Sequence, residues 1–210
     1  MAMPRARLLI VTIASMLAFS AVASSAANAV WMVNGTNFTS GTKALASTAA
    51  VDQAFRLATT DLEIKCAGST MKSRNAIING TTGMVDVESL EFTECTNGGG
   101  PCQLAESQFK TVPLLADLTL TGSNPSAAQG IFLPKTKGIF ATVKFQGEQC
   151  VMIGVLPIIG SQPFLAPTGR LERTLQTIAI SGPLTVEGLE GSLESSILAR
   201  LASNEPFSFL

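Results

Sequence analysis

Short runs of alternating hydrophobic and polar residues, separated by turn residues, make up most of the chain. In DLEIKC (61–66) two hydrophobic residues and a cysteine alternate with charged ones, and in LEFT (90–93) leucine and phenylalanine alternate with polar residues. A period of two residues is typical of a β-strand with one buried face. Asn79-Gly80 is a hairpin signal, and KTKG (135–138) resembles the tip of another hairpin. The pattern therefore predicts strands joined by short turns.

This succession of strands and turns favours an all-β fold, either an antiparallel β-sandwich or a barrel-like domain with little helix. Repeated strand–helix units would require amphipathic helical segments, which are scarce in this chain. We expect one domain over residues 30–210.

Two segments also fit a helix. Residues 42–55 (TKALASTAAVDQAF) are rich in alanine and predict a short helix of roughly two or three turns. Leu189, Leu193, Ile197 and Leu201 recur at every fourth residue, as they would on one face of a helix. Glycines and hydroxyl residues lie among them, so we predict a strand for this second segment.

Residues 151–160 (VMIGVLPIIG) contain no charged residue and are mostly aliphatic. Such a run predicts a central strand that is buried on both faces and then leads into a loop. The alternative interpretation is the wall of an apolar cavity, which would make the protein a carrier of a small apolar ligand inside a β-barrel.

The first 29 residues have the layout of a signal peptide. Arg5 and Arg7 precede an apolar stretch from residue 8 to residue 22, and Ala27-Asn28-Ala29 supplies small residues at the −3 and −1 positions of a cleavage site. The apolar stretch is shorter than the ~20 residues of a membrane-spanning helix. We expect cleavage after Ala29, a secreted or cell-envelope location, and no integral membrane span in the mature chain.

The mature chain carries little charge. The full sequence has 14 basic and 15 acidic residues, and loss of Arg5 and Arg7 leaves 12 basic ones, which gives a net charge of −3. No cluster of lysine and arginine is present, which excludes a nucleic-acid surface and a polybasic attachment to anionic lipid. Charged residues make up 14% of the chain against 46% hydrophobic ones, a balance that predicts a compact fold.

The four cysteines predict two disulfide bonds, because an even number in an exported chain is typical of a disulfide framework. Three pairings are possible. Cys95 and Cys102 flank a glycine-rich loop that would let its ends meet, so we predict Cys95–Cys102, which leaves Cys66 with Cys150. The chain has no histidine, no zinc-type cysteine spacing and no C-x-x-C redox pair. We expect no metal and no cofactor.

Catalytic motifs are scarce. The absence of histidine excludes Ser-His-Asp and Cys-His hydrolases, and no glycine-rich phosphate-binding motif occurs. Ser69 and Lys72 form S-x-x-K, an arrangement found in penicillin-binding proteins. The second polar motif and the K-[TS]-G strand of those enzymes are missing, so we interpret Ser69 as a turn serine. Ser69 and Lys72 remain catalytic candidates for a serine–lysine hydrolase.

Glu88, Glu91 and Glu94 are candidates for a different hydrolase, because a glycosidase needs two carboxylic acids at a suitable separation. Along a strand, Glu88 and Glu94 would share one face and Glu91 would point to the other. The alternative is that all three are charges at a solvated strand edge.

The start of the mature chain (VWMVNGTNFTSGT) and three segments that end in cysteine, LEIKC, LEFTECTNGGGPC and VKFQGEQC, resemble a loose group of secreted actinobacterial proteins without an assigned activity. The resemblance spans residues 31–200, implies export and a compact β fold, and transfers no site residue. Together the observations predict a non-enzymatic extracellular or envelope module with a binding or structural role. Its partner would be the cell wall, another surface or a small apolar ligand.

Overall fold

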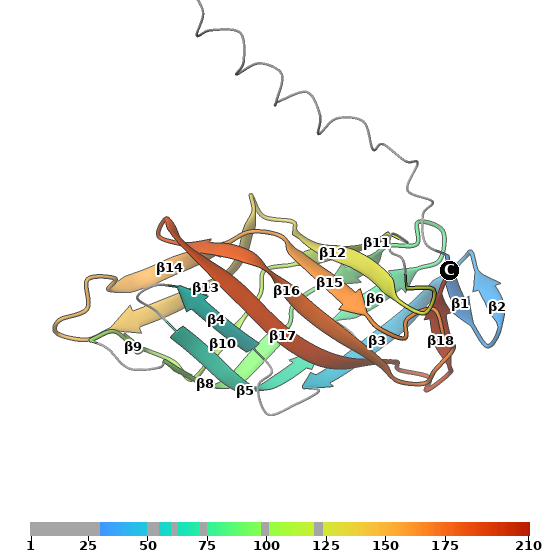
Figure 1. Cartoon of the computed structure of the whole chain (residues 1–210), viewed down its shortest axis with the longest axis horizontal. Coiled ribbons are helices and arrows are strands. Elements are labelled where there is room, and N and C mark those ends of the chain that lie inside the picture. Colours follow the sequence, from blue (N-terminus) through green and yellow to red (C-terminus); the bar gives the residue numbers. More distant parts are fainter. Residues whose placement is uncertain (1–29, 50–54, 60–62, 72–74, 98–100, 120–123) are drawn as a thin grey trace, which may run out of the picture.

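The computed structural model describes residues 30–49, 55–59, 63–71, 75–97, 101–119 and 124–210. All regular elements in these residues are strands (Figure 1). The strands of the first half are β1 (Trp31–Val33), β2 (Thr36–Phe38), β3 (Thr42–Ala49), β4 (Phe55–Thr59), β5 (Glu63–Met71), β6 (Ala76–Asn79), β7 (Val85–Val87), β8 (Glu91–Asn97) and β9 (Gln103–Leu104). Those of the second half are β10 (Gln108–Lys110), β11 (Leu114–Thr119), β12 (Ala128–Pro134), β13 (Ile139–Gln146), β14 (Gly154–Ile159), β15 (Gln162–Ala166), β16 (Gln176–Val186), β17 (Leu189–Leu201) and β18 (Phe207–Phe209).

Eight of these strands form a closed antiparallel barrel. Their order around the barrel is β3, β6, β7, β11, β12, β15, β16 and β17, and the pairing of β17 with β3 closes the ring. The all-β prediction is therefore confirmed, and of the two predicted arrangements the barrel is the one observed. Closure leaves these strands without a free edge, which removes the usual route to edge-to-edge aggregation.

The long hairpin of β16 and β17 extends beyond the barrel and supports a second group of strands (Figure 1). The first half of β16 pairs with β15, and its last residues pair with β14, which continues to β13 and β9. In the same way β17 pairs with both β3 and β4, and β4 continues to β5, β8 and β10. The molecule is therefore elongated, with one hairpin common to both parts.

One continuous core fills both parts. Large side chains that lie wholly inside include Phe92, Phe140, Phe145 and Ile158, and they belong to the same cluster as the residues inside the barrel. Burial alternates along β11, β15 and β16, as expected for strands with one face toward the core.

A small sheet covers one end of the barrel. Strands β18, β1 and β2 form it, and the backbone N–H groups of Val30 and Leu210 each donate to the other's carbonyl, at 2.5 and 2.8 Å. Trp31 packs edge-on against Phe209 with ring centroids 4.5 Å apart, and its indole N–H donates to the carbonyl of Gly83 at 2.6 Å. The first and last described residues are thereby joined over the barrel end.

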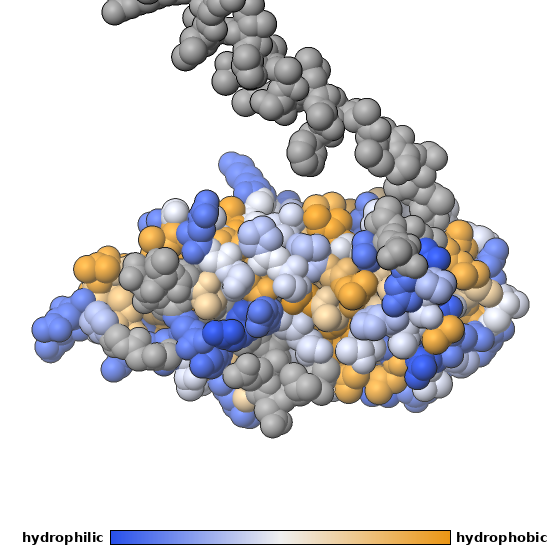
Figure 2. All heavy atoms as spheres, in the orientation of Figure 1, coloured by the Kyte–Doolittle hydropathy of each residue, from blue (hydrophilic) through white to orange (hydrophobic). Residues whose placement is uncertain are grey.

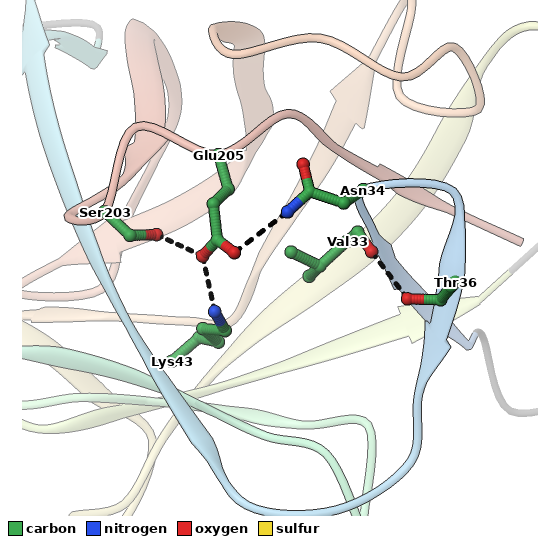
Figure 3. A network of polar contacts seen from close by, with 6 residues as sticks. All are labelled: Val33, Asn34, Thr36, Lys43, Ser203 and Glu205. Carbon is green, nitrogen blue, oxygen red and sulfur yellow. Dashed lines mark hydrogen bonds and ion pairs between the residues drawn. The ribbon is translucent and has the colours of Figure 1, made fainter.

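A polar network ties this end sheet to the barrel (Figure 3). The carboxylate of Glu205, just before β18, accepts hydrogen bonds from Asn34, Lys43 and Ser203. Lys43 belongs to β3, and Asn34 lies in the turn between β1 and β2. One carboxylate therefore connects three separate segments.

The predicted disulfide pairing is wrong. The bonds join Cys66 to Cys95 and Cys102 to Cys150, with Cα–Cα distances of 3.9 and 4.5 Å. Cys66 and Cys95 are direct partners in the β5–β8 register, so their side chains leave the two strands side by side. Cys102 precedes β9, whose pairing with β13 brings it close to Cys150. Strand pairing, rather than the short glycine-rich loop, determines which cysteines meet.

The local predictions had mixed outcomes. Asn79-Gly80 joins the paired strands β6 and β7, and the side-chain oxygen of Asn79 accepts the N–H groups of Thr81 and Thr82. The predicted strand near the C-terminal end is confirmed as β17. Residues 135–138 form a turn, but they connect β12 to β13, which pair with other strands.

The helix predicted over residues 42–55 is wrong for the part that is described. Residues 42–49 form β3 and Phe55 begins β4, whereas 50–54 lie outside the described residues. Strand β3 pairs with β17, β6 and β5, and this network of backbone hydrogen bonds outweighs the helix propensity of alanine.

Candidate functional site

The barrel interior is filled. Its remaining void has a volume of about 30 Å³ and apolar walls that include Leu45, Phe132 and Phe164. Binding sites for small molecules usually measure ~300–1,000 Å³, and 30 Å³ is about the space of one water molecule. As far as the described residues define it, the interior of this barrel therefore has no room for the small apolar ligand that a carrier would hold.

Ser69 does not lie in a turn, and that prediction is wrong. It is the seventh residue of β5, opposite Phe92 of β8, and only 8% of its surface is exposed. Its hydroxyl is buried and has no hydrogen-bond partner among the described residues. The register of β5 and β8 holds Ser69 toward the core, away from any substrate in solvent. Lys72 lies outside the described residues, so the serine–lysine pair stays a prediction.

The three glutamates do not gather around one cleft. Glu88 precedes β8, and Glu91 and Glu94 belong to it. Glu94 has a positive φ of 54°, which interrupts the regular alternation of side chains along the strand. Glu91 and Glu106 line a shallow groove of about 330 Å³, which neither Glu88 nor Glu94 lines. Catalysis by carboxylates also stays a prediction. No three cysteine or acidic side chains within the described ranges are grouped so as to hold a metal.

The most unusual feature of the surface is a wall without charge. Strands β12, β14, β15 and β16 contain no Asp, Glu, Lys or Arg, and the sequence has none from Val151 to Gly169. On β14 the side chains of Leu156 and Ile158 enter the core, whereas those of Val155 and Ile159 point outward and are 64% and 42% exposed. On β15, Phe164 is buried and Leu165 is exposed.

The residues before β14 extend this wall. Val151 is 94% exposed and Ile153 is 63% exposed, and the disulfide of Cys150 with Cys102 holds the start of the segment. We call the outward side chains of this segment, β14 and β15 the apolar face; they are Val151, Ile153, Val155, Pro157, Ile159, Pro163 and Leu165. Figure 2 shows hydrophobic residues at the end of the molecule that carries β14, and others are distributed over the rest of this side.

The prediction that residues 151–160 are buried on both faces is wrong. Only the inward side chains are covered, because β15 belongs to the barrel wall and β14 to the sheet that extends from β16, and no second layer lies over either strand within the described structure. Both sets of side chains are aliphatic, so the sequence has the pattern of a doubly buried strand although one face meets solvent. The exposed aliphatic side chains are the clearest indication of a partner in the described residues.

Charged residues gather on other strands. Arg56 of β4 forms ion pairs with Glu63 of β5 and Glu194 of β17, and Lys65 of β5 also pairs with Glu63. Hydrogen bonds from Lys65 and Arg56 lower the pKa of the Glu63 carboxyl. The protein thus has one wall rich in ion pairs and another that is free of charge.

Two lysines border the apolar face. Lys144 on β13 is the register partner of Val155, so the two side chains project from the same side of the sheet. Lys137 lies in the turn before β13, and the neighbouring Gly138 approaches Ile159 of the face. Neither lysine forms an ion pair with another described residue. The border of the face therefore offers two cations to a partner.

Comparisons with protein-family profiles, with curated proteins and with solved structures find no match to this chain. In the part of the chain that the structure describes, there is no helix of sufficient length and apolarity to cross a membrane. In the sequence, the apolar face corresponds to the charge-free stretch after Cys150. Aliphatic residues occupy both alternating sets of positions there, so the sequence does not indicate which set is exposed.

Proposed function

We propose that the protein is an exported, non-enzymatic module that binds a component of the cell envelope through the apolar face. The observation that carries this proposal is the exposure of Val151, Ile153 and Val155, which follow the disulfide-bonded Cys150. An aliphatic surface of this kind is unfavourable in water and is typical of an interaction site.

The remaining features support the same function. Two disulfide bonds are typical of an oxidising, extracellular environment, and residues 1–29 have the composition of a signal peptide. Because the barrel interior is filled, we expect any binding site to lie on the outer surface. Ser69 faces the core, which favours a binding role over serine–lysine hydrolysis.

The test is retention of the exported protein by the envelope. The full chain is expressed with its N-terminal segment in an actinobacterial host, and the protein in washed envelopes is compared with the protein in the medium. We expect retention of the wild type and release of Val151→Asp and Val155→Asp. Leu175→Asp is the matched control, because Leu175 is 44% exposed and lies beside Arg200 on another surface. Equal retention of all four proteins would contradict the proposal.

A further inference from the structure

We infer that the partner of the apolar face is the surface of a phospholipid bilayer, into which Val151, Ile153 and Val155 insert. This inference rests on the proposed function and specifies its partner. Val151 and Ile153 lie in the segment before β14 and Val155 lies on β14, and all three are exposed at alternate positions of one short stretch.

The chemistry of the face fits lipid better than protein. All of its side chains are aliphatic or proline, so none of them donates or accepts a hydrogen bond. Protein interfaces concentrate their binding free energy in tryptophan, tyrosine and arginine, and the face has none of these. A bilayer requires no such anchors, because it accepts aliphatic side chains without a complementary pocket.

The area of the face argues against a stable dimer of this chain. The face has five aliphatic residues that are 38–94% exposed and two prolines, whereas each side of a standard protein interface contributes about 20–30 residues. A standard protein interface buries ~800 Å² on each partner. Bilayer binding scales with the apolar area inserted, so a small face is sufficient for reversible attachment.

The charges at the border fit phospholipid headgroups. Lys144 lies beside Val155, and Lys137 precedes Gly138, which approaches Ile159; we expect both ammonium groups to reach phosphate when the aliphatic side chains are inserted. The exposed Glu148 lies on the loop between Lys144 and Val151, so the local net charge is small. Apolar insertion therefore supplies most of the affinity, and anionic lipid strengthens it moderately. This differs from the polybasic attachment that the composition excludes.

Co-sedimentation of the purified, oxidised protein with large vesicles tests the inference. We expect binding to phosphatidylcholine vesicles and tighter binding when phosphatidylglycerol is included. Val151→Asp should weaken the partition into both kinds of vesicle by about tenfold, the effect of losing one inserted valine. Because Val151 is 94% exposed, this substitution leaves the fold intact. Leu175→Asp, the control on another surface, should bind like the wild type.

The double variant Lys137→Gln and Lys144→Gln separates the two contributions. It should lose the preference for phosphatidylglycerol and keep its binding to phosphatidylcholine. Failure of the wild type to sediment with either vesicle, or equal binding by Val151→Asp, would overturn the inference. If envelopes retain the wild type and release Val151→Asp, but the wild type does not bind vesicles, the lipid partner is wrong and the proposed function still holds.

Discussion

The closure of the barrel end predicts a large loss of stability on substitution of Trp31. Trp31 is only 3% exposed, its ring contacts Phe207 and Phe209, and its indole N–H donates to Gly83. Truncation of a buried tryptophan to alanine costs about 3–5 kcal/mol, which includes the lost apolar contacts and the cavity left behind. We therefore expect Trp31→Ala to lower the free energy of unfolding by about 4 kcal/mol.

A graded series separates packing from hydrogen bonding at this position. Trp31→Phe keeps an aromatic ring but removes the indole N–H, which leaves the carbonyl of Gly83 without this donor and should cost about 1–3 kcal/mol. Met32→Ala is the control, because Met32 belongs to the same strand and is half-buried. It should cost less than Trp31→Ala by at least about 2 kcal/mol.

Urea unfolding followed by far-ultraviolet circular dichroism measures these differences, provided that the slope m is the same for all variants. A cost below about 1 kcal/mol for Trp31→Ala would show that the end sheet does not seal the barrel as described. A Phe variant as damaging as the Ala variant would show that the hydrogen bond, rather than packing, dominates.

Three further predictions concern other contacts of the fold. Peptide mapping without reduction should recover Cys66 linked to Cys95, and recovery of a Cys95–Cys102 peptide would contradict the β5–β8 register. Substitution of both Cys66 and Cys95 by alanine should lower the free energy of unfolding by about 3.5 kcal/mol in the chain-entropy model. Hydrogen bonds from Lys43 and Ser203 lower the pKa of the Glu205 carboxyl. The stability that this carboxylate contributes is therefore complete above its ordinary pKa of 4.5 and is lost as pH falls below that value. When unfolding is measured at decreasing pH, Glu205→Gln should lose stability less steeply than the wild type, and identical losses would argue against the network. Gly130→Ala should lower the free energy of unfolding by about 1–3 kcal/mol, because the new Cβ would lie 2.5 Å from the backbone oxygen of Asp117. Urea unfolding measures this change, and a neutral effect would mean that β11 and β12 do not lie as close together as described.

Local sequence patterns predict where the strands and turns lie, but they do not predict which strands pair with one another. The alternation around Ile64 and Phe92 and the Asn79-Gly80 turn specify strands and a hairpin through short-range effects that the sequence displays directly. The pairing of Cys66 with Cys95 depends on which strands become neighbours, and this is decided by the closing of the whole sheet. Tertiary pairing also converted the alanine-rich segment at 42–49 into strand β3.

The candidate site was visible in the sequence only as an absence of charge. The stretch after Cys150 is plainly aliphatic, but hydrophobic periodicity cannot distinguish a strand buried on both faces from a strand whose outer face binds a partner. For Ser69 and Lys72 the sequence suggests a site that the fold does not support at Ser69. Their spacing matches a catalytic motif, whereas the strand register turns Ser69 inward. A short motif has meaning only in the structural context that its chemistry requires.

Membrane insertion of the apolar face is the central claim, and fluorescence quenching by lipids with brominated acyl chains tests it most directly. The chain has one tryptophan, Trp31, which is buried in the end sheet and serves as an internal reference. A second tryptophan is introduced as Ile153→Trp or, as the control at an exposed leucine outside the face, as Leu171→Trp. The account predicts that brominated vesicles quench the added emission of Ile153→Trp and leave that of Leu171→Trp unchanged. Unquenched emission from both variants in the presence of excess vesicles would contradict it.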